Sequence, residues 1–383
     1  MSRDALFGAV RALGVDGLLL VGDSVCSPDI YYASRFLSSD RFAVLVTDRV
    51  HLLVSSMERS RASAESKADA VETTGDYSLK SRIEELGSVE KAYMKVLEEF
   101  VAARGISRLG MPSNAPAGIY RGLSERFDLV LLDRPFEHIR AVKTPEEISA
   151  IAEVQRACES AMNVAVNLIK KSKPSRGILV FDGEPLTSER VRSAVELRLA
   201  ELGCETLDTI VCGGLMSSSP HSRGSGPLPA DMPIVIDIFP RSKISRYFAD
   251  MTRTVVRGEP SSEIVEMYQA VKTAQEAGLE LIKDGVSGAD VHEAVCRTFD
   301  DFGYKEREEK GFIHSTGHGV GLSIHESPSL SEHGEMLRSG NVVTVEPGLY
   351  YPDTGGVRLE DLVVVRGNGC KNLTAFEKEL VIR

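Results

Sequence analysis

The 383-residue sequence contains no apolar run that approaches the roughly 20 residues a helix needs to span a bilayer. Its longest apolar segments, such as residues 17–21, have the length of strands. The N-terminal segment also lacks the long apolar stretch and the small-residue cleavage site of a signal peptide. These absences argue against a membrane protein and a secreted one, and we expect the protein to reside in the cytoplasm.

Paired cysteines and basic clusters are missing as well. The six cysteines are scattered and form no C-x-x-C pair, which argues against a disulfide framework and against a thiolate zinc site. The formal charge of −11 would repel a phosphate backbone, and no stripe rich in lysine and arginine offsets it. We therefore expect reduced thiols and no binding of nucleic acid.

The length exceeds the usual span of one hydrophobic core, so we expect two domains. In the first third, short apolar runs alternate with amphipathic stretches, which predicts an α/β domain with helices covering a sheet. The predicted strands are residues 17–22, 41–46, 50–55, 107–111 and 129–132, and the predicted helices are residues 4–13, 57–70 and 89–103.

The pattern changes after Arg140. Thr144 has the properties of an N-cap, Pro145 suits the first helical position, and two acids follow in the first turn. These residues predict the start of a long helix that runs to about Lys171. We place the domain boundary just before it, with residues 1–137 in the N-terminal domain and residues 138–383 in the second.

The second domain pairs helices with β-rich segments. Residues 171–184 are polar, with two glycines and a proline, and are interpreted as a loop or a short irregular insert. The predicted helices are residues 188–202, 261–283 and 289–302, and the predicted β segments are residues 206–212, 232–239 and 247–256, with strands and turns from residue 311 onward. This alternation predicts an α+β domain rather than a doubly wound parallel sheet.

Two aspartates occupy unusual places in the β-rich segments. Asp237 lies among β-branched and aromatic residues, although burying an unpaired carboxylate is costly. Asp250 follows a predicted hairpin turn at residues 241–245. Two facing strands could bring the carboxylates together. The alternative is that Asp237 ends its strand at the surface and Asp250 is a turn residue.

Two glutamates follow the same pattern. Glu346 ends an apolar strand and is closed by a Pro-Gly turn. Glu360 lies in an apolar segment, where the two-residue period of a strand puts it on the same face as Arg358. For those two residues, a surface Arg–Glu pair is the alternative.

Three of the eight histidines, His314, His318 and His325, fall within twelve residues among several glycines. His314 and His318 have the spacing of a helical zinc motif, but Gly317 and Gly319 would destabilise a helix. We therefore expect a loop or a strand to present these histidines. A solvated or buried structural role is the alternative for each of them taken singly.

Four carboxylates and one imidazole would form an oxygen-rich site suited to Mn²⁺, Co²⁺, Zn²⁺ or Fe²⁺. Two dications would offset the charge of four carboxylates almost completely. Without them, the acids would raise one another's pKa values. The set therefore predicts a metal centre in which the acids can share one pocket.

In chain order, Asp237, Asp250 and the segments 316–326, 344–350 and 358–361 closely resemble the signature of the pita-bread metallopeptidases. The nearest branch is that of the Xaa-Pro dipeptidases, or prolidases, and the Xaa-Pro aminopeptidases, and the resemblance covers nearly the whole chain. It implies a creatinase-like N-terminal α/β domain, followed by a pita-bread catalytic domain with a curved, mainly antiparallel sheet covered by helices. The chain departs from the family pattern in one place. The turn between Asp237 and Asp250 is longer than is usual in the family, and Phe239 stands where family members usually have a glycine.

The resemblance also implies two divalent metal ions per subunit, with manganese or cobalt expected first and zinc or iron as alternatives. By the family pattern, Asp237 binds one ion and Asp250 and Glu360 bridge the two. His318 and Glu346 complete the second ion's ligands.

The same resemblance implies the substrate residues. His221 and His325 contact the substrate near the scissile peptide bond, and Arg358 lies beside the last metal ligand and contacts the substrate. Glu346 is expected to shuttle a proton to the leaving nitrogen. The implied substrate is a short peptide containing proline, and the implied assembly is a homodimer.

The modest length and the compact N-terminal domain favour an Xaa-Pro dipeptidase. An Xaa-Pro aminopeptidase acting on longer peptides is the alternative within the fold, and the sequence does not decide between them. A methionine aminopeptidase is less favoured because it would not need residues 1–135. From other classes, a catalytically silent peptide-binding module and a hydrolase or lyase of an amide-like small molecule stay open.

Overall fold

The computed structural model describes residues 3–304 and 310–383. The chain divides into two compact units, Met1–Arg140 and Ala141–Arg383, each with its own core. No helix among the described residues has the length and the apolar character of a membrane span.

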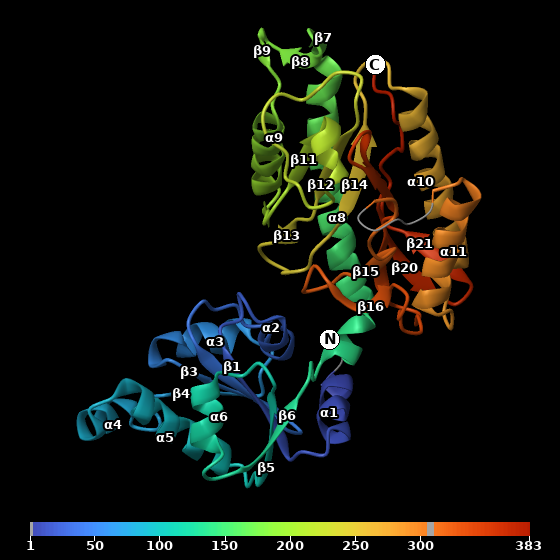
Figure 1. Ribbon diagram of the computed structural model, residues 1–383. Coiled ribbons are helices and arrows are strands. Elements are labelled where there is room, and N and C mark those ends of the chain that lie inside the picture. The colour runs from blue at the N-terminus through green and yellow to red at the C-terminus, as the bar shows by residue number, and fades with distance from the viewer. Residues whose placement is uncertain (1–2, 305–309) are drawn as a thin grey trace. The chain divides into compact units, whose positions relative to one another are not determined.

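A six-stranded mixed sheet forms the centre of the first unit, in the order β4-β3-β2-β1-β5-β6 (Figure 1). Its central strand β1 pairs antiparallel with β2 and parallel with β5. The strands are β1 (Gly17–Gly22), β2 (Phe42–Val46), β3 (Val50–Val54), β4 (Ala70–Thr73), β5 (Arg108–Pro112) and β6 (Asp128–Leu132). The residues of β2 are all buried, as expected for a strand covered on both faces.

The helices of the first unit are α1 (Arg3–Ala12), α2 (Pro28–Ser34), α3 (Arg59–Glu65), α4 (Leu79–Leu86), α5 (Val89–Ala102) and α6 (Ala117–Leu123), with α7 (Glu137–Ala141) at the division between the units. The predicted strands and the helices near residues 4–13 and 89–103 are confirmed. The helix predicted for residues 57–70 is wrong in its second half. There α3 ends at Glu65, and the Asp69 carboxylate accepts a hydrogen bond from the backbone of Val50 at the edge of the sheet.

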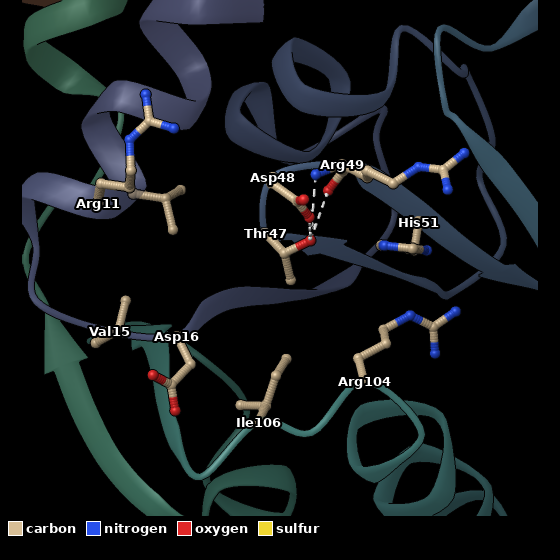
Figure 2. Close-up of a pocket in the computed structure, with 10 residues that line it drawn as sticks. Arg11, Val15, Asp16, Thr47, Asp48, Arg49, His51, Arg104 and Ile106 are labelled. Carbon is tan, nitrogen blue, oxygen red and sulfur yellow. Dashed lines mark hydrogen bonds between the residues drawn. The ribbon is translucent and has the colours of Figure 1, made fainter.

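The first unit contains a cavity of about 490 Å³, shown in Figure 2. It is lined by Val10, Arg11, Val15, Asp16, Thr47, Asp48, Arg49, His51, Arg104 and Ile106. The guanidinium groups of Arg11 and Arg49 point away from each other, so they do not converge on one point. None of the predicted site residues lies in this unit.

Two helix pairs flank the β-structure of the second unit (Figure 1). They are α8 (Pro145–Lys171) with α9 (Ser188–Glu201), and α10 (Ser262–Leu281) with α11 (Gly288–Asp301). The predicted start of α8 is confirmed, because Thr144 and Glu147 form a reciprocal capping box that satisfies backbone N–H groups of the first turn.

All strand pairs of the second unit are antiparallel among the residues that the structure describes. One sheet has the order β11-β12-β14, a second has the order β16-β15-β17-β20-β21, and β18 pairs with β19. These strands are β11 (Ile210–Gly213), β12 (Ile234–Ile238), β14 (Met251–Val255), β15 (Gly317–Gly319), β16 (Glu326–Leu330), β17 (Val342–Val345), β18 (Gly348–Tyr351), β19 (Gly355–Arg358), β20 (Asp361–Arg366) and β21 (Gly369–Asn372). The predicted α+β class is confirmed.

The prediction of a loop or a short irregular insert for residues 171–184 is wrong, because the segment is regular. The segment forms a small sheet of β7 (Lys173–Ser175), β8 (Ile178–Phe181) and β9 (Glu184–Pro185). Its turns fall at two X-Gly pairs whose residues all have positive φ angles, as tight hairpins require. The sequence carried this turn signal, and the polar composition concealed it.

Two short strands, β10 (Cys204–Glu205) and β13 (Arg241–Ser242), pair with each other beside the main sheets. The β segment predicted for residues 206–212 is shorter in the structure, where β11 begins at Ile210. The single-turn helix η2 (Gly214–Ser218) follows β11 and leads toward His221.

Candidate metal centre

The two aspartates meet on facing strands. Asp237 lies in β12 and Asp250 immediately precedes β14, and these strands pair antiparallel with Asp237 opposite Thr252. Asp237 is 9% exposed and Asp250 is 5% exposed. The surface alternative for these acids is therefore wrong, and the predicted approach of the two strands is confirmed.

The remaining three residues come from the other half of the unit. His318 lies in β15, Glu346 follows β17, and Glu360 lies between β19 and β20. The Nε2 atom of His318 is 3.1 Å from Oε1 of Glu346 and 3.8 Å from Oδ2 of Asp250. One potential ligand atom each from Asp250, His318 and Glu360 lies within 4.8 Å of the others. The structure thus gathers a group that can hold a metal ion.

Three carboxylate oxygens of this group are buried without a hydrogen-bond partner among the described residues: Oδ1 of Asp237, Oδ1 of Asp250 and Oε1 of Glu360. Burial raises the pKa of Asp237. Burial and the charges of neighbouring carboxylates raise the pKa values of Asp250 and Glu360 well above their usual range. Such unsatisfied, mutually repelling oxygens are costly in a protein interior, and bound cations would satisfy them.

The imidazole of His318 is held in one orientation. Its Nδ1 lies 3.1 Å from the carbonyl oxygen of Gly319, which directs Nε2 toward the acids. Burial disfavours charge on both His318 and Glu346, but their hydrogen bond and mutual attraction prevail. They raise the pKa of His318 to about 9 and lower that of Glu346 to about 2. Thr344 supports the pair, since its hydroxyl accepts from the His318 backbone and donates to Glu346.

Arg358 ties the two halves of the site together. It is 4% exposed, and its guanidinium donates to Oδ2 of Asp237 at 2.7 Å and to the hydroxyl of Tyr350 at 2.8 Å. It also donates to the hydroxyl of Thr252 and to the carbonyl of Pro220, next to His221. A surface Arg–Glu pair is therefore wrong for Arg358 and Glu360, and the single strand predicted through both residues is interrupted between β19 and β20.

The two other predicted histidines lie at the rim. His325 is exposed overall, yet its ring stands at 77° to that of His318 with the centroids 4.3 Å apart. Burial and the positive charge of His318 lower the pKa of His325, and His221 contributes to the same shift. His221 is exposed and follows η2. The structure therefore places both histidines close to the acidic group.

Sequence reasoning missed several residues of the site. Thr252 donates its hydroxyl to Oε2 of Glu360 at 2.8 Å. Tyr350 stands between Arg358 and His314, whose Nε2 lies 3.0 Å from the Tyr350 hydroxyl. Burial lowers the pKa of His314 to about 4, so this imidazole is neutral and its Nε2 can accept a hydrogen bond from the Tyr350 hydroxyl. Strand alternation places Thr252, two residues after Asp250, on the same face as that aspartate, but it gives no sign of the contact with Glu360.

A buried group of acids with one imidazole, on paired antiparallel strands between helix pairs, is an arrangement that could hold a divalent metal ion. Residues 149–367 match the model of metallopeptidase family M24, and residues 3–142 match that of the creatinase/prolidase N-terminal domain. The chain belongs to metallopeptidase family M24. The resemblance to the pita-bread metallopeptidases and the predicted two-part fold are thereby confirmed.

Several known proteins are similar along most of the chain. An uncharacterized peptidase of Bacillus subtilis is 33% identical over 100% of this chain and 100% of its own length. An Xaa-Pro dipeptidase of Pyrococcus horikoshii is 33% identical over 76% of this chain and 80% of its own. The crystal structure of an X-Pro aminopeptidase from Thermotoga maritima superposes with a TM-score of 0.81 at 27% identity, over 98% of this chain and 100% of that one.

Proposed function

We propose that this chain is a divalent-metal-dependent peptidase that hydrolyses the peptide bond preceding proline at the N-terminal end of short peptides, as an Xaa-Pro dipeptidase. The observation that carries this function is the set of three buried carboxylate oxygens without partners, on acids whose charges repel one another. Such an arrangement is stable as an ionised site when cations bind to it. The similarity to an Xaa-Pro dipeptidase supports the choice of substrate.

In this proposal, Asp237, Asp250, His318, Glu346 and Glu360 hold two divalent ions, with manganese or cobalt expected first and zinc or iron as alternatives. Once bound, the ions would polarise the scissile carbonyl and lower the pKa of a water molecule. Residues 138–383 would form the catalytic domain. The protein would act as a cytoplasmic homodimer.

The chain's own residues orient the substrate and move protons. His325 and His221 lie at the rim, where they can donate hydrogen bonds to the substrate carbonyl as negative charge develops on it. Glu346 accepts the proton of the attacking water and delivers it to the leaving proline nitrogen. Its hydrogen bond from Thr344 fixes the carboxylate for this transfer.

We propose that Arg358 has mainly a structural role in the site, rather than binding the substrate directly. Four of its five N–H groups donate to the protein, which leaves at most one for a peptide. In our proposal it keeps Asp237 ionised and in place, and it holds the backbone before His221. A substrate carboxylate would then need a further anchor.

The substrate length is tested with an Xaa-Pro dipeptide, an Xaa-Pro-Yaa tripeptide and a peptide that starts with methionine, offered to the Mn²⁺- or Co²⁺-loaded protein. We expect cleavage of the dipeptide and little or none of the others, with all activity lost in a chelator. Cleavage of the tripeptide before proline would identify an aminopeptidase instead. Failure to cleave any of the three would contradict the proposed peptidase and favour a silent peptide-binding module.

Metal binding should also be visible in thermal stability. Saturating Mn²⁺ or Co²⁺ should raise the melting temperature of the chelator-treated protein, because ions bound only to the folded state add about 2.7 kcal/mol at a concentration of 100 times Kd. Differential scanning calorimetry with and without metal measures the shift. An unchanged melting temperature at saturating metal would contradict a built metal centre.

A further inference from the structure

A buried lysine–glutamate ion pair lies close to the candidate metal centre. The Nζ atom of Lys143 is 2.7 Å from Oε1 of Glu326, and their side chains are 1% and 7% exposed. Lysine is almost never fully buried without a partner, because its charge must leave water. Neither residue belongs to the group of acids around Asp250, so that group does not explain their burial.

Lys143 is fixed from the backbone outward. Its N–H donates to the carbonyl of Gly340, and its Nζ also donates to the carbonyl of Ala141. The next residue, Thr144, caps α8, and Val142 forms a β-bridge with Asn341 at the start of β17. The ammonium group therefore projects from a rigid junction of a long helix and a central strand.

Glu326 closes the loop between β15 and β16. Its Oε2 accepts the N–H of Ser323, and its carboxylate lies against the backbone of Gly321. A Cβ atom at Gly321 would stand 2.0 Å from Oε1 of Glu326, so only glycine leaves room for the carboxylate. The loop backbone is closed further by a hydrogen bond from Gly321 to the carbonyl of Ser323.

His325 occupies the last position of this loop, directly before Glu326. Its ring meets that of His318, while the adjacent Glu326 is tied to Lys143 on the far side of the loop. Figure 1 shows β15 and β16 beside the beginning of α8, in agreement with this contact. The pair thus connects the histidine's loop to the junction of α8 and β17.

We propose that Lys143 and Glu326 are positioning residues that hold His325 in the geometry needed to contact the substrate. This role rests on the proposed function of His325. A displacement of about 1 Å from a catalytic geometry can cost on the order of 100-fold in rate. Such a pair would therefore act on the reaction without touching the substrate.

Single substitutions would confuse positioning with folding, because removing one partner leaves a buried unpaired charge. The double variant K143M/E326Q removes both charges together, and the new amide can still accept the N–H of Ser323. The control is K95M/E98Q, which removes a Lys–Glu pair of similar length, 2.8 Å, with a half-exposed lysine, in the first unit.

For K143M/E326Q we expect about a 10–100-fold lower kcat with KM changed less than about threefold. Combined with H325A, the double variant should cause no further loss, because the residue that it positions is already gone. K95M/E98Q should retain the wild-type kcat. A wild-type kcat in K143M/E326Q, or losses that multiply with those of H325A, would overturn the positioning role.

A spectroscopic arm separates this inference from the proposed function. The imidazole NMR signal of His325, identified by its absence in H325A, should shift in K143M/E326Q and stay in place in K95M/E98Q. G321A should shift the same signal, because its methyl group displaces the Glu326 carboxylate. A signal that shifts in neither K143M/E326Q nor G321A would overturn the positioning role, even if no Xaa-Pro peptide is cleaved. A shifted signal without cleavage would contradict only the proposed function.

Discussion

Replacement of Asp250 by asparagine is expected to lower the turnover of an Xaa-Pro dipeptide by on the order of 1000-fold or more. Metal ions supply several kcal/mol of transition-state stabilisation, and each 1.36 kcal/mol that is lost lowers the rate tenfold. Asp250 is 5% exposed and contributes a potential ligand atom to the group with His318 and Glu360. An amide has no charge to hold two cations in place. Turnover in a metal-replete assay and the metal content of the purified variant measure the effect.

The same substitution should have the opposite effect on stability without metal. Burial and the charge of Asp237 raise the pKa of Asp250 well above its usual range, so its ionised form is destabilising when no cation is bound. The metal-free variant should therefore melt above the metal-free wild type. Asp301→Asn, at an exposed position on α11, is the matched control and should change neither property. Wild-type turnover in Asp250→Asn would exclude its role as a metal ligand.

Replacement of Arg253 by methionine is expected to lower the free energy of unfolding by about 3–5 kcal/mol. Arg253 is 2% exposed and donates to Oδ1 of Asp361 at 2.9 Å. It also donates to four backbone carbonyls, those of Thr252, Glu360, Phe376 and Glu377. The substitution would remove a donor from each of these acceptors, of which Asp361 and the carbonyl groups of Thr252 and Glu360 belong to buried residues. Urea denaturation would measure the loss of stability.

Arg253 should matter for metal binding as well, because two of its acceptors belong to the backbone around the site. Residues that orient ligands in this way typically change metal affinity by about 10–100-fold, and we expect a loss of that size in calorimetric titrations with Mn²⁺. Arg297→Met, an exposed arginine on α11, serves as the control for loss of a guanidinium. An Arg253→Met protein with unaltered stability and metal affinity would rule out this supporting role.

The acids of the site could be predicted from the sequence because they break a strong rule. Asp237 interrupts an apolar strand and Glu346 ends one, where an unpaired carboxylate is costly, and the structure brings the two acids close together. The glycines around His318 also predicted correctly that a helix does not present it. Helix ends with strong chemical signals, such as Thr144, were equally readable.

The residues that hold the acids could not be predicted in the same way. Thr252 and Arg253 read as ordinary members of a strand, and their roles depend on contacts with residues more than 100 positions away. Lys143 reads as a solvated lysine before a helix until its partner Glu326 is brought to it by the fold. Contacts between residues so far apart in the sequence are set by tertiary structure, and local sequence patterns do not predict them.

The most direct test of the central claim is a titration of the metal-free protein with Mn²⁺ or Co²⁺, with bound metal and Xaa-Pro dipeptide turnover measured on the same samples. Two ions held by Asp237, Asp250, His318, Glu346 and Glu360 predict that turnover is absent without metal and rises until two equivalents are bound per chain. Full turnover in the metal-free protein, or saturation of binding without any turnover, would contradict a dinuclear Xaa-Pro peptidase.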